Sequence, residues 1–146
     1  MKKLTVLALS VALFSTTAFA NSNVVYSCTT MENLPVVVKK EGNNYVFSYD
    51  KMTFKNPIKE ALKNPESEIA GGSQFTTATL ELRNKGYSYV IGHIEPRGNP
   101  KGAFEASFTL KETKTGRVIE TFECLPNKPI KHNFDRKLMQ KSGFAA

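Results

Sequence analysis

The sequence predicts an antiparallel β-sandwich or a small β-barrel of about seven strands, with one short helix and a C-terminal helical tail. Three observations lead to this expectation. Short segments in which apolar and polar residues alternate follow one another along most of the chain. Turn-forming residues separate these segments by only a few positions, which is typical of antiparallel connections. The chain has 146 residues, which suffices for one domain and a tail and excludes a multidomain enzyme or a long repeat array.

The first twenty residues lie outside this predicted domain. Lys2 and Lys3 form a basic start, residues 4–14 are almost wholly apolar, and Ala18-Phe19-Ala20 has the small residues of a signal-peptide cleavage site. This pattern predicts that residues 1–20 are a bacterial secretory signal peptide. The alternative is an uncleaved anchor, but the apolar run is short for a membrane span. We therefore expect a periplasmic or secreted protein whose mature chain, from Asn21, has no transmembrane segment.

The chain contains two cysteines, Cys28 and Cys124. In an oxidising compartment they allow one intramolecular disulfide, which would close a β domain over residues 21–124. The alternative, a reactive thiol pair, lacks the C-x-x-C spacing of redox motifs. The sequence therefore predicts a Cys28–Cys124 disulfide between the first and last strands.

The first three strands are predicted at residues 24–30, 35–40 and 44–50. β-Branched and aromatic residues dominate them, and a Gly-containing turn makes the last two a hairpin. In the third strand an aromatic stripe falls on one face, where we expect core rather than a ligand surface. This stripe consists of Tyr45, Phe47 and Tyr49.

The pattern changes at Asn56-Pro57. Asn is a favourable helix N-cap and Pro suits the first helical position. Apolar residues then recur at helical spacing as far as Asn64-Pro65, which predicts one helix of about two turns; they are Ile58, Ala61 and Leu62. Residues 66–73, which contain a Gly-Gly pair, are expected to form a loop.

Four more strands are predicted at residues 75–83, 87–95, 104–112 and 117–124. The first alternates clearly, with Ala78, Leu80 and Leu82 on its inner face. Its other face is polar, so we expect this face to contact solvent, as in antiparallel sheets that are covered on one side. The residues of the polar face are Thr77, Thr79, Glu81 and Arg83.

Residues 125–146 form a tail of different character. Pro126 and Pro129 are expected to end the sheet, because proline cannot donate to a strand ladder. Three apolar residues then recur every four positions, and Asn133 is the expected N-cap of a helix of about two turns. The apolar residues are Ile130, Phe134 and Leu138.

The positive charge of the mature chain is concentrated in this tail. The whole chain has a net charge of +7, but residues 21–124 hold 13 basic and 12 acidic residues, whereas the tail holds 5 basic and 1 acidic. The basic residues form a candidate surface for an anionic partner such as a lipid headgroup, an acidic polysaccharide or an acidic protein; they are Lys128, Lys131, Arg136, Lys137 and Lys141. The alternative is a helix that packs its apolar side on the domain and solvates its charges. Export makes nucleic acid an unsuitable partner.

Residue types suited to catalysis are not arranged in a recognisable motif. The sequence contains no Gly-x-Ser-x-Gly elbow and no Gly-rich phosphate loop. His93 and Glu95 are two residues apart in a predicted strand, so both side chains lie on one face, but two ligands do not define a metal site. The sequence thus predicts no catalytic residue, metal site or cofactor.

The segment Val24-Val25-Tyr26-Ser27-Cys28, with a second cysteine near the end of the domain, resembles the small periplasmic lysozyme-inhibitor and adhesin-complex families. Those families are compact β-barrels or sandwiches that bind lysozyme or host surfaces. The resemblance implies a non-enzymatic binding protein, in one version an inhibitor of a wall-degrading enzyme. The Ser-Gly-x-x-Tyr loop of the C-type inhibitors is missing from this sequence. The alternative is an envelope structural or surface-associating protein that uses its basic tail.

Overall fold

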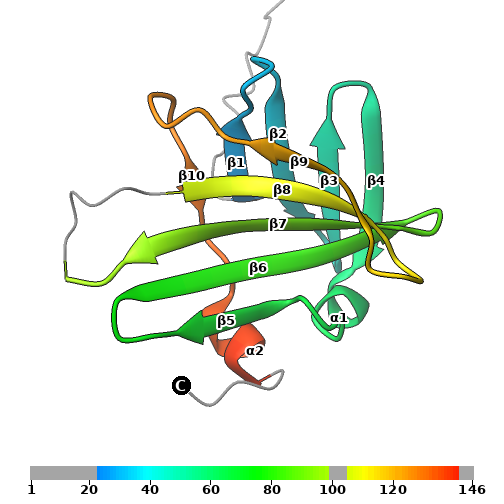
Figure 1. The fold of residues 1–146 in the computed structure, drawn as a ribbon. Coiled ribbons are helices and arrows are strands. Elements are labelled where there is room, and N and C mark those ends of the chain that lie inside the picture. The colour runs from blue at the N-terminus through cyan, green and yellow to red at the C-terminus, as the bar shows by residue number, and fades with distance from the viewer. Residues whose placement is uncertain (1–22, 99–104, 142–146) are drawn as a thin grey trace, which may run out of the picture.

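Two antiparallel sheets of five strands each face one another in the computed structural model, which describes residues 23–98 and 105–141 (Figure 1). The first sheet contains, in spatial order, β10 (Lys131–His132), β1 (Val24–Thr29), β2 (Pro35–Glu41), β3 (Asn44–Tyr49) and β4 (Met52–Pro57). The second contains β5 (Glu68–Gly71), β6 (Phe75–Asn84), β7 (Tyr87–Pro96), β8 (Glu105–Glu112) and β9 (Val118–Glu123). The predicted fold class is confirmed in its sandwich form, since the described strands do not close into one barrel.

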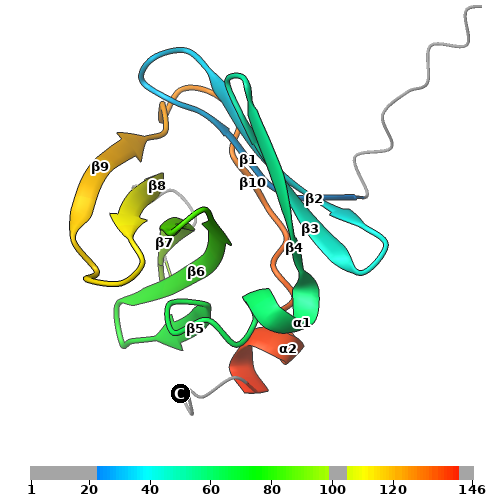
Figure 2. The same ribbon diagram turned by 90° about the vertical axis from the view of Figure 1, so that its right-hand side faces the viewer.

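Two short helices, α1 (Ile58–Ala61) and α2 (Arg136–Lys141), lie at the lower end of the molecule in both views (Figures 1 and 2). Among the described residues, neither helix has the length and apolar character needed to cross a membrane. The predicted signal peptide, residues 1–20, lies outside the described residues.

All seven predicted strands are confirmed, as β1, β2, β3, β6, β7, β8 and β9, with ends that differ by at most one residue. Their apolar faces meet between the sheets, where Leu80 and Leu82 are fully buried. The aromatic stripe of β3 belongs to this core. The ring of Phe47 lies at its centre, with ring centroids 5.0 Å from Phe54 and 5.3 Å from Tyr89.

The short helix predicted after Asn56-Pro57 is present as α1 (Ile58–Ala61), but its predicted length of two turns and its predicted cap, Asn56, are wrong. Residues 52–57 form β4, an edge strand, and α1 is a single turn in which no side chain caps the N-terminus. Proline at the end of an edge strand removes no ladder hydrogen bond that the sheet needs. The Asn56 side chain instead lies across the sandwich. Its Oδ1 accepts the backbone N–H of Arg83 at 2.7 Å and its Nδ2 donates to the carbonyl of Arg83 at 2.8 Å.

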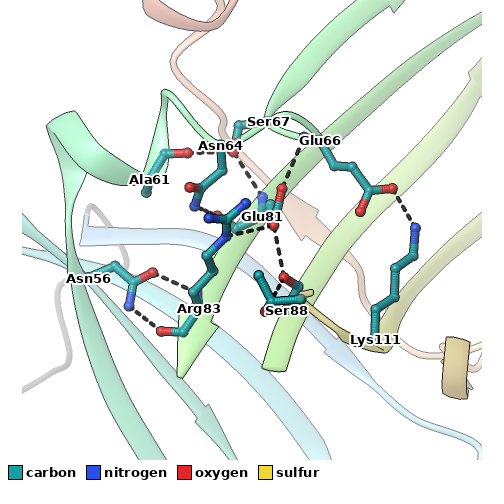
Figure 3. Close-up of polar contacts among 10 residues, drawn as sticks. Asn56, Ala61, Asn64, Glu66, Ser67, Glu81, Arg83, Ser88 and Lys111 are labelled. Atoms are coloured by element: carbon teal, nitrogen blue, oxygen red, sulfur yellow. Dashed lines mark hydrogen bonds and ion pairs between the residues drawn. The ribbon is translucent and has the colours of Figure 1, made fainter. Parts of the chain in front are cut away.

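The expected loop at residues 66–73 is also wrong in part, because Glu68–Gly71 pair with β6 as β5. The preceding residues cover the polar face of β6, which we expected to contact solvent. Glu81 on that face is only 3% exposed. Residues 64–67 cover it, because their polar groups form hydrogen bonds with the backbone and the side chain of Glu81 (Figure 3).

The Glu81 carboxylate is the centre of this buried network. Its Oε1 accepts hydrogen bonds from Arg83 Nε at 2.9 Å and Ser88 Oγ at 2.8 Å, and its Oε2 accepts the backbone N–H of Glu66 at 3.0 Å (Figure 3). Burial alone raises the pKa of Glu81, but these hydrogen bonds and the charge of Arg83 outweigh it and hold the pKa below its ordinary value. Glu81 is therefore an ionised structural group that attaches the α1–β5 connection to the second sheet.

The tail differs from its prediction in three ways. Its first part is the short strand β10, so the sheet does not end at the prolines. The helix N-cap is Asp135 rather than Asn133, since Asp135 Oδ1 accepts the backbone N–H of Leu138 at 3.2 Å. Leu138 is 42% exposed, and Met139 is buried in its place. The period of four fails because Phe134 precedes the helix and only residues from 136 onward have helical spacing.

The predicted disulfide between Cys28 and Cys124 is present and spans 96 positions of the sequence. It lies where the end of β1 meets the chain that leaves β9. The backbone N–H groups of Met31 and Leu125 donate to the carbonyls of Glu123 and Thr29 at 2.9 and 2.7 Å. The disulfide thus joins the two sheets at one margin, and the Asn56–Arg83 contact joins them at another.

Candidate functional site

The inner face of β7 carries the two residues that the sequence singled out, His93 and Glu95. His93 lies between Ala78 of β6 and Ala106 of β8 in the sheet. These small neighbours leave room for the imidazole. His93 as a whole residue is only 4% exposed. Because alternate residues of a strand share a face, Glu95 lies on the same side one step toward the open end of the sheet.

The tail brings the second histidine of the chain to this pair. His132 of β10 pairs with Tyr26 of β1 in the opposite sheet, and the next residue donates its backbone N–H to Val25 at 2.7 Å. The His132 ring faces β7, with its centroid 4.0 Å from that of His93. Its Nε2 lies 3.0 Å from Glu95 Oε1. The cluster of His93, Glu95 and His132 therefore spans both sheets.

Two further tail residues complete the surroundings of the cluster. Phe134 stacks on His93 with centroids 5.6 Å apart and planes inclined by 10°. The Arg136 guanidinium lies 3.6 Å from Glu95 Oε2, so the two oxygens of this carboxylate contact two different side chains, those of His132 and Arg136. Burial, followed by the charges of His132 and Arg136, lowers the pKa of His93 to about 3. The His93 imidazole is thus neutral near neutral pH.

A cavity of about 390 Å³ lies beside the cluster. Residues 132–137 of the tail form one side of it, and His93 with apolar residues of β5 and β6 forms the other. The lining of the cavity is mixed, with three apolar residues and six polar or charged ones: Ile69, Ala78, Phe134, His93, His132, Asn133, Asp135, Arg136 and Lys137. A concave site in which several polar groups converge is a candidate ligand site. Arg136 and Lys137 are the basic residues that line it.

The five basic residues of the predicted anionic-partner surface do not all lie together. Arg136 and Lys137 line the cavity, as above. Lys131 pairs with Ser27, so its side chain leaves the sheet on the face opposite to that of His132. Lys128 is exposed in the turn before β10. The side chain of Lys141 lies outside the described residues.

The cluster also has the donor chemistry of a metal site. One ligand atom from each of His93, Glu95 and His132 lies within 4.8 Å of the other two. Two imidazole nitrogens and one carboxylate oxygen suit zinc and neighbouring divalent ions of the first transition row. The described chain can therefore offer three ligands at one point, beside a cavity that gives access to it.

Sequence reasoning identified the His93 and Glu95 pair but not His132, because a two-residue strand after two prolines has no periodic signal. The predicted disulfide was the signal that could have found it. A bridge from Cys124 to the end of β1 obliges the following residues to start beside that strand. No protein-family model, curated protein or solved structure matches this chain, so its function is inferred from the geometry of this site.

Proposed function

We propose that this protein is a small exported binding protein that holds an anionic group of an envelope partner in the cavity beside its C-terminal tail. The observation that carries the proposal is the placement of Arg136 and Lys137 at a cavity of about 390 Å³. A guanidinium has five N–H donors, and Arg136 contacts Glu95 through one nitrogen at 3.6 Å. It therefore retains donors for a carboxylate or phosphate oxygen of a ligand.

Export is the second part of the proposal. It rests on the predicted signal peptide at residues 1–20 and is supported by the disulfide, because such bonds persist in oxidising compartments. Periplasmic location brings the protein next to anionic lipid headgroups and acidic polymers of the envelope. We take an anionic lipid surface as the partner to test first, because the exposed Leu138 lies one position beyond Lys137 and offers an apolar contact.

The double substitution Arg136→Gln/Lys137→Gln is expected to weaken binding to phosphatidylglycerol vesicles by about tenfold, which corresponds to roughly 1.4 kcal/mol for two lost charged contacts. Co-sedimentation of the mature chain with such vesicles measures this effect. Lys114→Gln/Lys128→Gln is the matched control, because it also removes two positive charges, at exposed positions that do not line the cavity. It should change the affinity much less.

Deletion of the tail is not a suitable substitute for these variants, because Phe134 and Met139 belong to the core and β10 to a sheet. Equal losses from Lys114→Gln/Lys128→Gln and from Arg136→Gln/Lys137→Gln would show general charge attraction and contradict a cavity site. Binding to phosphatidylcholine vesicles with the same affinity would contradict the anionic requirement. Preference for a soluble acidic polysaccharide over both vesicles would assign a different partner and reject the lipid surface.

A second candidate function is inhibition of a wall-degrading enzyme, and β9 is the observation that favours it. This strand is the last of its sheet in the described fold and is exposed along most of its length. Val118 and Ile119 are 55% and 43% exposed, and Glu120 and Glu123 lie beside them. An exposed strand edge can pair with a partner, and the two carboxylates would complement a basic enzyme such as a lysozyme.

Titration of the mature protein against lysozymes of several classes is expected to inhibit at least one of them. The variant Glu120→Lys/Glu123→Lys should abolish that inhibition, because it places like charges opposite a basic enzyme. Glu41→Lys/Glu60→Lys is the control, since it also reverses two exposed carboxylates, on β2 and α1 rather than on β9. No inhibition by the unaltered protein at micromolar concentration would reject this function.

A further inference from the structure

The three potential ligands at the cavity come from two strands that belong to different sheets. His93 and Glu95 belong to β7, and His132 belongs to β10. Their positions are set by features already described: the alternation of β7, the two alanines beside His93, and the pairing of His132 with Tyr26. The cluster is therefore held by the fold on both sides, as a metal site with preorganised ligands requires.

The separations within the cluster are close to those of a zinc site. Four-coordinate zinc has bonds of about 2.0–2.2 Å to nitrogen and oxygen, so its ligand atoms lie roughly 3.4 Å apart. Glu95 Oε1 and His132 Nε2 are 3.0 Å apart, and all three ligand atoms lie within 4.8 Å of one another. An ion that enters the cluster would replace the direct contact between Glu95 and His132, and small side-chain adjustments would bring the three ligand atoms to the separation that zinc requires.

The cluster can be reached from the cavity. The side chains of His132 and Glu95 are 27% and 30% exposed, while His93 is buried behind them. The 390 Å³ cavity reaches both histidines. A bound ion would thus have three protein ligands and a remaining coordination position toward the cavity, the arrangement in which zinc keeps water or an exogenous group as its fourth ligand.

We propose that His93, Glu95 and His132 form a binding site for a divalent transition-metal ion of the zinc class, with one coordination position open to the cavity. The donor set excludes Mg²⁺ and Ca²⁺ as preferred ions, because these hard cations select oxygen ligands. Arg136 is the group that opposes the ion, since its guanidinium lies 3.6 Å from the second oxygen of Glu95 and competes for that carboxylate. This inference goes beyond the anion-binding proposal and does not depend on it.

The test is a titration of the untagged, chelator-treated mature chain with Zn²⁺ by calorimetry, and with Co²⁺ by visible absorption. We expect one ion per chain and a Co²⁺ spectrum with nitrogen and oxygen ligands. Both histidines of the sequence belong to the cluster, so no other histidine can contribute to the measured metal binding. Mg²⁺ and Ca²⁺ should not compete at equal concentration.

Three variants make the test specific. His132→Gln and Glu95→Gln keep a hydrogen-bonding group of similar size and should each weaken Zn²⁺ binding at least about tenfold, the low end of what loss of an outer partner costs. Arg136→Gln should strengthen Zn²⁺ binding, because it removes a cation that contacts Glu95. Glu60→Gln, which neutralises an exposed carboxylate on α1, should leave the affinity unchanged. Circular dichroism without metal confirms that each variant is folded.

The failure of this inference is distinguishable from the failure of the proposed function. Arg136→Gln is expected to strengthen metal binding and to contribute to weaker vesicle binding, so the two results move in opposite directions. Absence of Zn²⁺ binding to the unaltered chain would overturn the metal site. So would His132→Gln and Glu95→Gln variants that bind Zn²⁺ as tightly as the unaltered chain does. Equal binding of Mg²⁺ and Zn²⁺ would overturn it as well.

Discussion

Replacement of Cys28 and Cys124 by alanine is expected to lower the free energy of unfolding by about 4–5 kcal/mol. The disulfide closes a loop of 96 positions, and closure of a long loop removes much of the entropy of the unfolded chain. A small domain has a total stability of only about 5–15 kcal/mol, so this loss takes the protein close to its unfolding threshold. Urea unfolding followed by circular dichroism measures it.

Reduction of the unaltered protein is the control for this experiment. It opens the same loop without the cavity that two alanines create next to Tyr26, whose hydroxyl lies 3.5 Å from Cys124 Sγ. We expect the reduced protein to lose nearly as much stability as the double variant. A reduced protein with the unfolding midpoint of the oxidised one would show that the disulfide does not stabilise the fold.

The variant Glu81→Gln is expected to lower the free energy of unfolding by roughly 2–4 kcal/mol. The carboxylate accepts three hydrogen bonds in a buried position, and an amide leaves at least one buried donor without an acceptor, at a cost of about 1–3 kcal/mol each. Glu112→Gln is the matched control, because Glu112 also pairs with an arginine, but that arginine, Arg117, is largely exposed. A surface pair of this kind contributes only about 0–1 kcal/mol.

The pH dependence gives Glu81 a second, independent signature. Its pKa in the folded protein is lower than the ordinary value of 4.5, so the folded state binds fewer protons than the unfolded state. The stabilisation is therefore complete above that ordinary value and is lost as the pH falls through the lower folded pKa. The difference between the unaltered protein and Glu81→Gln should shrink in this acid range. A difference that stays constant would contradict the assignment.

The strands that sequence reasoning found are those whose signal is local. Residues 77–83 and 105–110 alternate between apolar and polar side chains, so their inner faces were predictable without knowledge of their partners. β5 has four residues and β10 has two, and both exist because a neighbouring strand offers them hydrogen bonds. Asn56 misled the prediction because its side chain suits a helix cap, whereas the fold uses it against the backbone of Arg83.

The same distinction applies to the candidate site. His93 and Glu95 share a face because of strand geometry, which the sequence contains. Their meeting with His132 depends on the return of the tail beside β1, which is a tertiary event. For Glu81 the sequence predicts the correct face of β6 but the wrong exposure. Alternation places Glu81 on the outer face, and the α1–β5 connection then buries it.

The position of β1 between β2 and β10 sets the order in which the fold can be completed. An exported chain that crosses the membrane from its N-terminus would present Cys28 to the oxidising compartment before Cys124. During that interval β1 can pair with β2 on one side only, and the thiol of Cys28 has no partner within its own chain. The Cys28–Cys124 disulfide can therefore form only when nearly the whole chain has entered that compartment. Two incomplete chains held close together would be prone to form an intermolecular disulfide through Cys28.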